Sequence, residues 1–474
     1  MGERPITWLT ALGAAVLLSP LVAFGFLRAF PQYDHQIIAT HFHFYIVGFT
    51  SLGASLACAV VMGSARTLNN TRLIFLGLAF FAIGGIFAVH GLNTPGFIHD
   101  EYFASLGVSA WLSAFAGSAF VALSVVGLPH RLEHMIEDNG KGVFGLAMLA
   151  IFSYIGLSLW GITGHWLDWV PIDSRTNQLA VGFAALGLTA FAVWRYYQAY
   201  LFARLPSQLA MIATLVILLE VQVIIVWGNV WQLSWWFYHG LYGIAFVVLF
   251  AGWTIEVRRA GTLRAIADAL SMRDALAQLN RGLPQPILEL VDAVETKDRE
   301  TFGHVRRVSS YAVAVGRRLG LSQQDLRSLA LAAQMHDVGK ITVPSSILVK
   351  PGPLTSDEFA VIQKHTVRGD EIAGRVRALC SLANVIRHHH ERYDGGGYPG
   401  GLAGDEIPLL SRIITIVDSY DAMTSKRPYR DSLGHEHALA EIIRLKGVQF
   451  DPACVDAFCA VVADKTLPEI EHAA

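Results

Sequence analysis

The chain has 474 residues, of which 53% are hydrophobic and 16% are charged. This composition is too apolar for a soluble protein of this length, so we expect part of the chain to lie in lipid. A formal net charge of -2 provides no basic excess, which argues against DNA or RNA as a partner. The cysteines form no CxxC pair, which argues against a disulfide framework and a cysteine metal site.

The first 257 residues contain repeated apolar runs separated by short polar loops. Each run is long enough to cross about 30 Å of hydrocarbon. The pattern predicts about eight transmembrane helices, and we interpret the first as a helix that is retained rather than a cleaved signal. The expected spans are Ile6–Phe30, Phe44–Gly63, Leu73–Leu92, Phe103–Gly127, Val143–Gly164, Leu179–Tyr200, Ser207–Trp227 and Leu233–Val257.

Basic residues are concentrated on alternate connections between the expected spans. Arg66 and Arg72 follow the second span, and Arg258 and Arg259 follow the last. The opposite connections carry acidic residues such as Asp100 with little compensating base. Because cytoplasmic loops carry an excess of Lys and Arg, we expect both termini and the C-terminal half in the cytoplasm. The chain is therefore predicted to be a multi-pass protein of the cytoplasmic (inner) membrane, surrounded by membrane lipid.

Beyond residue 257 the composition becomes that of a soluble helical protein. Leu263, Ile266 and Leu270 recur at helical spacing, which predicts a connecting helix. This stripe is equally consistent with a short coiled coil between two protomers and with a helix packed on its own domain. Pro284 and Pro286 end the helix, and no β-alternation follows, so the remainder is predicted to be all-α. The expected divisions are a membrane domain at 1–257, a linker at 258–286 and a helical domain at 287–474.

The helical domain contains histidines and acidic residues whose spacing suits metal binding. Glu300 and His304 are four residues apart, so both can project from one helix face toward one ion. In Met335–Lys340, His336 and Asp337 are adjacent; the aspartate can bridge two cations while the histidine holds one of them. Mixed imidazole and carboxylate ligands favour transition ions over Mg²⁺ or Ca²⁺.

Three motifs that are separated in the sequence make this set of histidines and acidic residues specific to one family. They are the His336-Asp337 pair, the run His389–Pro399 (HHERYDGGGYP) and the run Asp418–Arg430 (DSYDAMTSKRPYR). In this order, within residues 287–466, they resemble the HD-GYP family of metal-dependent phosphohydrolases. The resemblance implies a helical bundle that hydrolyses cyclic di-GMP to pGpG, GMP or both. It also implies that the membrane half acts as a sensor that regulates this enzyme.

The resemblance also implies a ligand set for two or three metal ions, with Fe or Mn expected and Zn or Ni as alternatives. The first ion is assigned to His336, Asp337 and Asp418, with Asp337 as the bridge. The second ion is assigned to His365, His389 and His390. The positions of Glu300 and His304 match those that add a third ion in some family members.

The same resemblance assigns the residues that contact substrate. Lys340 lies four residues after His336, where an ammonium can neutralise the scissile phosphate or protonate the leaving oxygen. Arg427 and Arg430 match the basic pair that grips the phosphates. Asp337 and Lys340 are therefore the predicted catalytic residues. The glycine-rich run Gly395–Pro399 is expected to form a lid or a docking surface, for example for a diguanylate cyclase partner.

Two alternative functions remain open at this stage. One is a receptor that binds a cyclic dinucleotide without cleaving it; such a receptor normally lacks a metal ligand, and none is missing here. The other is the same chemistry on a different cyclic dinucleotide such as cyclic GMP-AMP, since base recognition lies outside the motifs. The expected oligomeric state is a homodimer.

Polar residues in the expected spans suggest a second site. By the topology above, His41, His43, His90 and His239 lie at the outer ends of three spans, and Glu220 lies in the outer half of another. Intramembrane polar groups are costly and tend to be functional, so these residues are candidate ligands for a sensed metal ion or haem. The alternative is that interfacial histidines simply sit at headgroup level and bond to loops.

Overall fold

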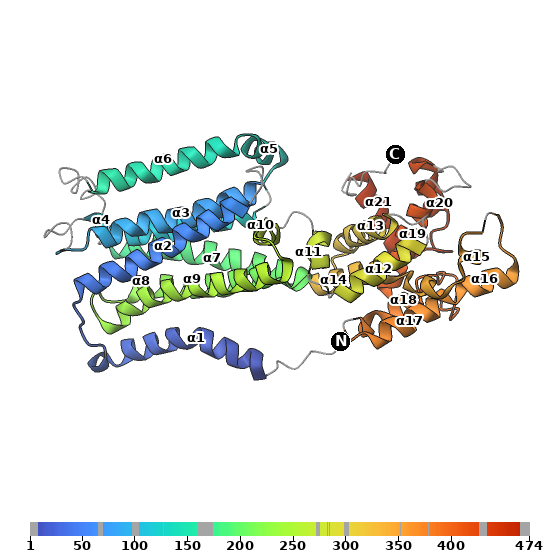
Figure 1. The fold of residues 1–474 in the computed structure, drawn as a ribbon, viewed down its shortest axis with the longest axis horizontal. Coiled ribbons are helices and arrows are strands. Elements are labelled where there is room, and N and C mark those ends of the chain that lie inside the picture. Colours follow the sequence, from blue (N-terminus) through green and yellow to red (C-terminus); the bar gives the residue numbers. More distant parts are fainter. Residues whose placement is uncertain are drawn as a thin grey trace. The chain divides into compact units, whose positions relative to one another are not determined.

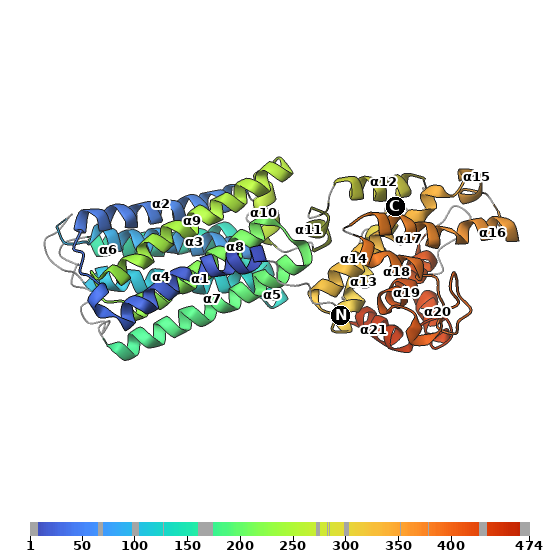
Figure 2. The same ribbon diagram turned by 90° about the horizontal axis from the view of Figure 1, so that it is seen from below.

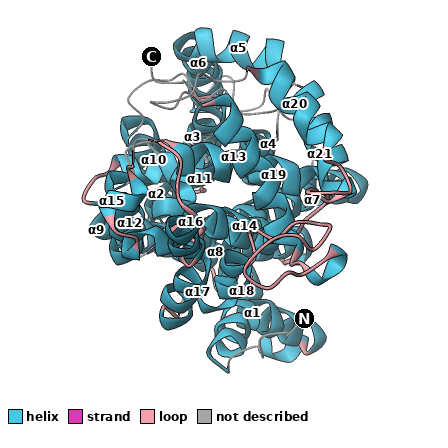
Figure 3. Cartoon of the chain, turned by 90° about the vertical axis from the view of Figure 1, so that its right-hand side faces the viewer, coloured by secondary structure: helices cyan, strands magenta, loops and turns pink. Residues whose placement is uncertain are grey.

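The chain is described by a computed structural model covering residues 8–64, 70–96, 104–126, 128–159, 174–271, 275–281, 283, 285–297, 303–350, 352–377, 379–425 and 434–464. Within these ranges every named element is a helix, and the only β pairing is two isolated bridges (Figure 3). The predicted all-α class is therefore confirmed. The chain divides into an N-terminal unit, Met1–Tyr200 with Arg204–Arg273, and a C-terminal unit, Leu201–Ala203 with Asp274–Ala474.

The N-terminal unit is a bundle of apolar helices, several of which run side by side (Figures 1 and 2). Its elements are α1 (Trp8–Ala29), η1 (Pro31–Tyr33), α2 (Thr40–Ser64), α3 (Thr71–Leu92), α4 (Ala104–Val125), α5 (His130–Asp138), α6 (Gly140–Leu159), α7 (Arg175–Ala203), α8 (Pro206–Trp227) and α9 (Leu233–Ala260). Among the described residues, seven helices (α2, α3, α4, α6, α7, α8 and α9) are long and apolar enough to cross a membrane. They match the last seven expected spans. The first expected span coincides with α1, whose apolar segment Ala15–Ala29 is shorter than these seven helices.

Small and polar side chains let these helices pack closely. A Cβ atom at Gly252 of α9 would overlap the Cβ of Ala210 on α8, so the two backbones approach closely only because Gly252 has no side chain. Elsewhere a buried hydrogen-bonded group joins α4, α7 and α8. The Gln222 amide donates to Ser118 at 2.9 Å and to Thr189 at 3.0 Å, and Thr189 donates to Ser118 at 2.9 Å.

The loop before α2 fixes the start of α9. The Asp34 carboxylate accepts hydrogen bonds from the Ser234 backbone N–H at 2.8 Å and from the Ser234 hydroxyl at 2.7 Å. A carboxylate stabilises a helix N-terminus because the first backbone N–H groups have no partner within the helix. The Ile37 N–H adds a bond to the Trp231 carbonyl at 2.7 Å. The first turns of α2 and α9 are therefore held next to each other.

The connection after α9 is not the single helix that the sequence predicts. α9 ends at Ala260, and Gly261 adopts the left-handed conformation with φ of 73°, which interrupts the helix. Two short helices follow, α10 (Arg264–Ser271) and α11 (Ala275–Arg281). Ile266 and Leu270 are buried in the core of the N-terminal unit, whereas Leu263 is 61% exposed. Of the two readings of the stripe, the described contacts support packing on its own domain.

The C-terminal unit is built from short amphipathic helices. Its elements are α12 (Gln285–Lys297), α13 (His304–Arg318), α14 (Gln323–Met335), η3 (Val338–Thr342), α15 (Ser345–Leu348), α16 (Ser356–Gln363), α17 (His365–Arg375), η4 (Cys380–Leu382), α18 (Ala383–Arg387), η5 (Gly404–Glu406), α19 (Leu409–Thr424), α20 (His435–Arg444) and α21 (Pro452–Ala463). α13 packs against α14, α19 and α21, and α17 packs against η3 and α18. These contacts bring the ends of helices that are distant in sequence to one place.

We expect Gly252→Leu to destabilise the N-terminal unit by about 1–3 kcal/mol or more, because the new side chain overpacks the contact with α8. Gly240→Leu on the same helix is the matched control, since a Cβ atom there meets nothing within 4 Å. Thermal unfolding of both variants in detergent measures the effect. Equal melting temperatures for the two variants would show that the close approach of α8 and α9 does not limit stability.

Candidate metal centre

The Asp337 carboxylate lies between two histidines from different elements. His336 and Asp337 follow the last residue of α14 and precede η3. Oδ2 of Asp337 lies 3.4 Å from Nε2 of His336, and Oδ1 lies 3.4 Å from Nε2 of His365. The two oxygens of one carboxylate thus address two separate imidazoles, as a bridge between two cations requires. The Lys340 ammonium donates to Oδ2 at 2.7 Å.

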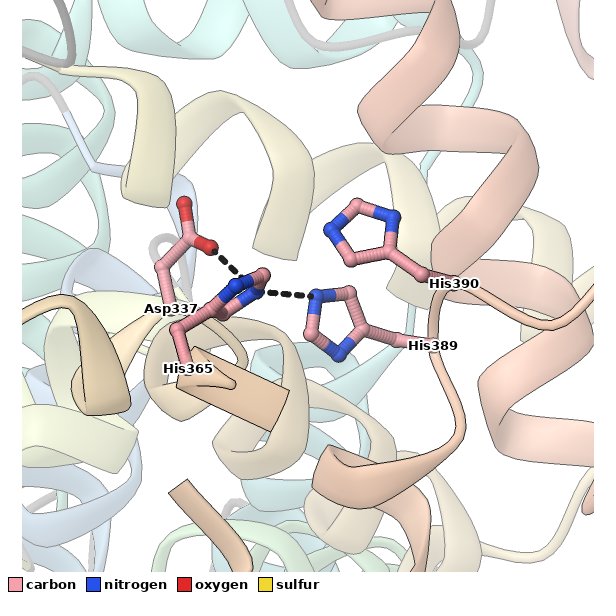
Figure 4. Close-up of side chains that lie close together, drawn as sticks. All are labelled: Asp337, His365, His389 and His390. Atoms are coloured by element: carbon pink, nitrogen blue, oxygen red, sulfur yellow. Dashed lines mark hydrogen bonds and ion pairs between the residues drawn. The ribbon is translucent and has the colours of Figure 1, made fainter. Parts of the chain in front are cut away.

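One candidate ligand group surrounds Asp337 and is drawn in Figure 4. It contains His365, the first residue of α17, and the adjacent pair His389 and His390, which follow α18. One ligand atom from each of these four residues lies within 4.8 Å of all the others. Nε2 of His365 and Nε2 of His389 are 3.4 Å apart.

A second candidate group lies beside the first. It contains His304, the first residue of α13, together with His336 and Asp418 of α19. Oδ1 of Asp418 lies 3.3 Å from Nε2 of His304 and 3.8 Å from Nε2 of His336. The two groups are adjacent because His336 and Asp337 are consecutive residues.

The structure therefore brings together every predicted metal ligand that it describes, although the grouping differs in one respect. His304, which the family resemblance assigns to a third ion, lies within reach of the same Asp418 oxygen as His336. Lys340 lies in the site as predicted, but its described contact is to Asp337. Glu300, Arg427 and Arg430 lie outside the described residues.

Backbone hydrogen bonds fix the orientation of three ring systems. Nδ1 of His336, His365 and His389 each donates to the carbonyl three residues earlier, at 2.8, 2.7 and 2.6 Å respectively. A carbonyl oxygen can only accept, so each Nδ1 carries the hydrogen and each Nε2 presents a lone pair to the site. Nε2 of His336 is buried and has no hydrogen-bond partner among the described residues. Metal-bound histidines are held in this manner, so the donor set fits a metal centre.

The electrostatics of the first group also suit a metal ion. Burial lowers the pKa of His365, lowers that of His389 well below its ordinary value, and brings that of His390 to about 4. Burial alone would raise the pKa of Asp337, but the Lys340 ammonium holds it well below its ordinary value. Neutral imidazoles and an ionised carboxylate are the protonation states that bind metal at neutral pH.

A buried ion pair positions His304, and sequence reasoning misses one member of it. Nδ1 of His304 donates to Asp421 at 2.7 Å, and Asp421 in turn accepts from Arg307 at 2.6 and 3.0 Å. This arrangement aims Nε2 of His304 at Asp418. Burial would raise the pKa of Asp421, but the hydrogen bonds from His304 and Arg307 lower it. The available signal was spacing, since Arg307 and Asp421 lie one helical turn after His304 and Asp418.

The glycine-rich loop is fixed by hydrogen bonds. The buried Glu391 carboxylate accepts from the N–H groups of Gly400 at 2.6 Å and Leu402 at 3.2 Å. A Cβ atom at Gly397 would overlap the backbone of Glu391, so the chain can take this path only with glycine there. The Tyr398 ring lies 5.0 Å from the His390 ring, between their centroids. The loop therefore lies against the site through Tyr398, and these bonds fix its path.

We expect Gly339→Ala to weaken metal binding about tenfold or more, because a Cβ atom at Gly339 would overlap the His365 carbonyl and push the start of α17 away from Asp337. Gly374→Ala on α17 is the control, since a Cβ atom there meets nothing within 4 Å. Metal content after dialysis, measured by mass spectrometry, tests this prediction. Unchanged retention in Gly339→Ala would contradict it.

We expect Arg307→Met to cost about 3 kcal/mol of stability at neutral pH, because it leaves the buried Asp421 carboxylate without its bidentate partner. The Asp421 contribution is present above its unfolded pKa of about 4 and is lost as the pH falls through its lower folded pKa. The difference in the free energy of unfolding between the variant and the wild type should therefore become smaller below about pH 4. Denaturant unfolding at several pH values, with a chelator present to keep the protein free of metal, measures this difference. Arg306→Met, at an exposed position, is the control. A difference in unfolding free energy that grows in acid would refute the assignment.

Comparisons with known proteins agree with this site. Residues 289–454 match the HD domain family. The chain is 42% identical over 196 residues to the cyclic di-GMP phosphodiesterase response regulator RpfG of Xanthomonas campestris, covering 41% of this chain and 52% of that protein. It is 37% identical over 221 residues to a probable cyclic di-GMP phosphodiesterase of Vibrio cholerae, covering 43% and 46%.

A further relative is the 3'3'-cGAMP-specific phosphodiesterase 2 of Vibrio cholerae, with 41% identity over 183 residues that cover 38% of this chain and 35% of that protein. The chain thus spans about half the length, or less, of these curated relatives. Residues 289–454, which match the HD domain family, lie within the C-terminal unit and contain the HD pair and the glycine-rich motif. Residues 289–454 therefore carry an HD domain, and the motifs within them resemble those of HD-GYP phosphodiesterases.

Proposed function

We propose that the C-terminal unit hydrolyses cyclic di-GMP to pGpG, GMP or both in a metal-dependent reaction. The observation that carries this proposal is the position of Asp337, whose two oxygens face His336 and His365 at 3.4 Å each. Such a carboxylate joins two ligand groups into one binuclear centre, and two adjacent cations are suited to phosphodiester displacement. The relatives described above are cyclic di-GMP phosphodiesterases by name, which supports a cyclic dinucleotide as the substrate class.

The donor set supports two or three transition-metal ions, Fe or Mn foremost and Zn or Ni as alternatives. When bound, such ions supply Lewis acidity toward a phosphoryl oxygen and a nucleophile at neutral pH. Asp337 and His336 belong to the shared part of the centre, while His365, His389 and His390 complete one side. His304 and Asp418 complete the other side, and Glu300 is proposed to join them where a third ion is held.

Protein side chains then bind and orient the substrate. The Lys340 ammonium is 19% exposed and is anchored to Asp337, so its charge lies at the edge of the centre, where a phosphoryl oxygen would sit. There it stabilises the charge that develops on phosphorus and can donate a proton to the leaving oxygen. Arg427 and Arg430 are proposed to grip the non-bridging oxygens through bidentate hydrogen bonds.

The N-terminal unit is proposed to be a sensor in the cytoplasmic membrane that regulates this reaction. Its seven long apolar helices support membrane insertion, and the distribution of Arg and Lys supports a cytoplasmic catalytic unit. We also propose that the chain acts as a homodimer. The fixed glycine-rich loop, with exposed positions such as Asp394 and Gly396, offers a surface for a diguanylate cyclase.

A second substrate deserves a direct comparison because a cGAMP-specific relative shares 41% identity with this chain. In the proposed reaction the metal centre would act on a phosphate group, which all cyclic dinucleotides share, so its geometry does not favour one of them over another. Incubating the purified full-length protein with cyclic di-GMP or with cyclic GMP-AMP, followed by product analysis, separates the two. Binding of either nucleotide without any cleavage would instead favour the non-hydrolysing receptor.

We expect Asp337→Asn to reduce turnover of cyclic di-GMP by at least about 10²-fold while the protein stays folded, because an amide cannot bridge two cations with both atoms. Asp357→Asn, at an exposed position of α16, should retain wild-type turnover. Turnover is measured with saturating Mn²⁺ and after exhaustive chelation. Wild-type activity that survives chelation would refute the metal-dependent mechanism.

A further inference from the structure

Three histidines converge inside the N-terminal unit. His43 lies in the first turn of α2, His90 near the end of α3 and His239 in the second turn of α9. All three are buried, and one ring nitrogen from each lies within 4.8 Å of the others. The sequence predicted these residues as candidate ligands from their expected depth, and the described structure brings them into contact.

Hydrogen bonds leave two ring nitrogens facing each other. Nδ1 of His90 donates to the Leu106 carbonyl at 2.8 Å, so Nε2 of His90 presents a lone pair. That lone pair lies 3.1 Å from Nε2 of His43, whose Nδ1 lies 2.8 Å from the Thr94 hydroxyl. If His43 donates to Thr94, two lone pairs face each other and a cation between them removes the repulsion. If Thr94 donates instead, His43 can donate to His90 and that pair is satisfied without an ion.

His239 decides between these two arrangements. It is fully buried, and neither of its ring nitrogens has a hydrogen-bond partner of ordinary geometry among the described residues. The Trp235 carbonyl can serve only one of the two ring nitrogens, so a network confined to His43 and His90 leaves the other nitrogen of His239 without a partner. A buried polar group in that state costs roughly 1–3 kcal/mol. An ion that accepts a lone pair from all three rings satisfies them together.

We propose that His43, His90 and His239 bind one transition-metal ion within the membrane bundle. Bonds from Zn²⁺ and similar ions to imidazole nitrogen are about 2 Å long, so tetrahedral ligand atoms lie about 3.3 Å apart. The 3.1 Å separation of the His43 and His90 nitrogens matches that spacing. A haem does not fit between these two rings, because two axial ligands on opposite sides of an iron would be about 4 Å apart.

The surroundings control access to this cluster. Trp235 stacks on His43 with ring centroids 5.3 Å apart, and Phe87 stacks on His90 at 5.1 Å. A cavity of about 250 Å³ opens onto His43 and His90 and also contains Arg175. The cavity leaves space beside His43 and His90 for a fourth ligand. A cationic guanidinium in the same cavity suits an anionic fourth ligand such as hydroxide or chloride.

Neighbouring contacts hold the three helices in register for binding. The Asp34 carboxylate fixes the start of α9 beside the start of α2, as described above. The Tyr238 hydroxyl lies 3.2 Å from Nε2 of His90, where it can donate to the lone pair of that nitrogen when no ion is bound. Because these ligands are already held in place, binding an ion costs little conformational entropy.

The other two candidates do not join this cluster. His41 is exposed, because a side chain two positions before His43 points to another side of the helix. Glu220 of α8 is buried and its carboxylate oxygens have no hydrogen-bond partner among the described residues, but it is not part of the three-histidine group. His41 therefore serves as a matched control.

The test uses the full-length protein in detergent with Co²⁺ as the probe, and it requires no phosphodiesterase activity. The background carries His336→Ala, Asp337→Ala and His389→Ala to remove ligands of the other centre. We expect about one equivalent of Co²⁺ with the visible absorption of a tetrahedral site, displaced by Zn²⁺. His239→Phe should weaken this binding at least tenfold, while His41→Ala should leave it unchanged.

Two outcomes would overturn the proposal. One is that the background protein binds no Co²⁺ with a tetrahedral spectrum; the other is that His239→Phe binds it as tightly as His41→Ala does. Phenylalanine keeps an aromatic ring in the core, and size-exclusion chromatography checks the fold. Should His239→Phe aggregate, His43→Gln and His90→Gln are judged by the same criterion.

Discussion

The C-terminal unit depends on one constraint, that a single carboxylate must reach two histidine groups at once. Asp337 meets this constraint because η3 and the start of α17 approach so closely that only glycine fits at position 339. Burial keeps the surrounding imidazoles neutral, and the Lys340 ammonium keeps the carboxylate ionised. Close packing and charge therefore act together, since the approach that excludes water also strengthens the electrostatic contacts.

The same kind of hydrogen bond orients histidine rings in both units of the chain. In the C-terminal unit, three histidines donate through Nδ1 to carbonyls of the preceding helical turn and present Nε2 to the centre. In the N-terminal unit, His90 donates through Nδ1 to the Leu106 carbonyl of another helix and likewise presents Nε2 inward. The backbone thus selects one tautomer in both places, and a lone pair without a proton is what a metal ion needs.

Several features could be predicted from the sequence because they depend on local patterns. The apolar runs define the long helices, and the HD pair with His389 and His390 defines most of the ligand set. Arg307 was missed because its role is to hold Asp421, which is 114 residues away in the sequence and comes near only in the folded chain. The break after α9 was also missed, although Gly261, directly after the last turn with Arg258 and Arg259, is a local helix-stop signal.

That break constrains how the two units communicate. His239 and the end of α9 at Ala260 are about 32 Å apart along one helix, so a change at the histidine cluster can reach the far end of α9 as a rigid shift. The shift cannot continue through an unbroken helix, because Gly261 interrupts it. It must instead pass through the buried contacts of Ile266 and Leu270 with the bundle core. α10 is therefore packed as part of the N-terminal unit, so in the proposed sensor a shift of α9 would be carried through these contacts as far as Ser271.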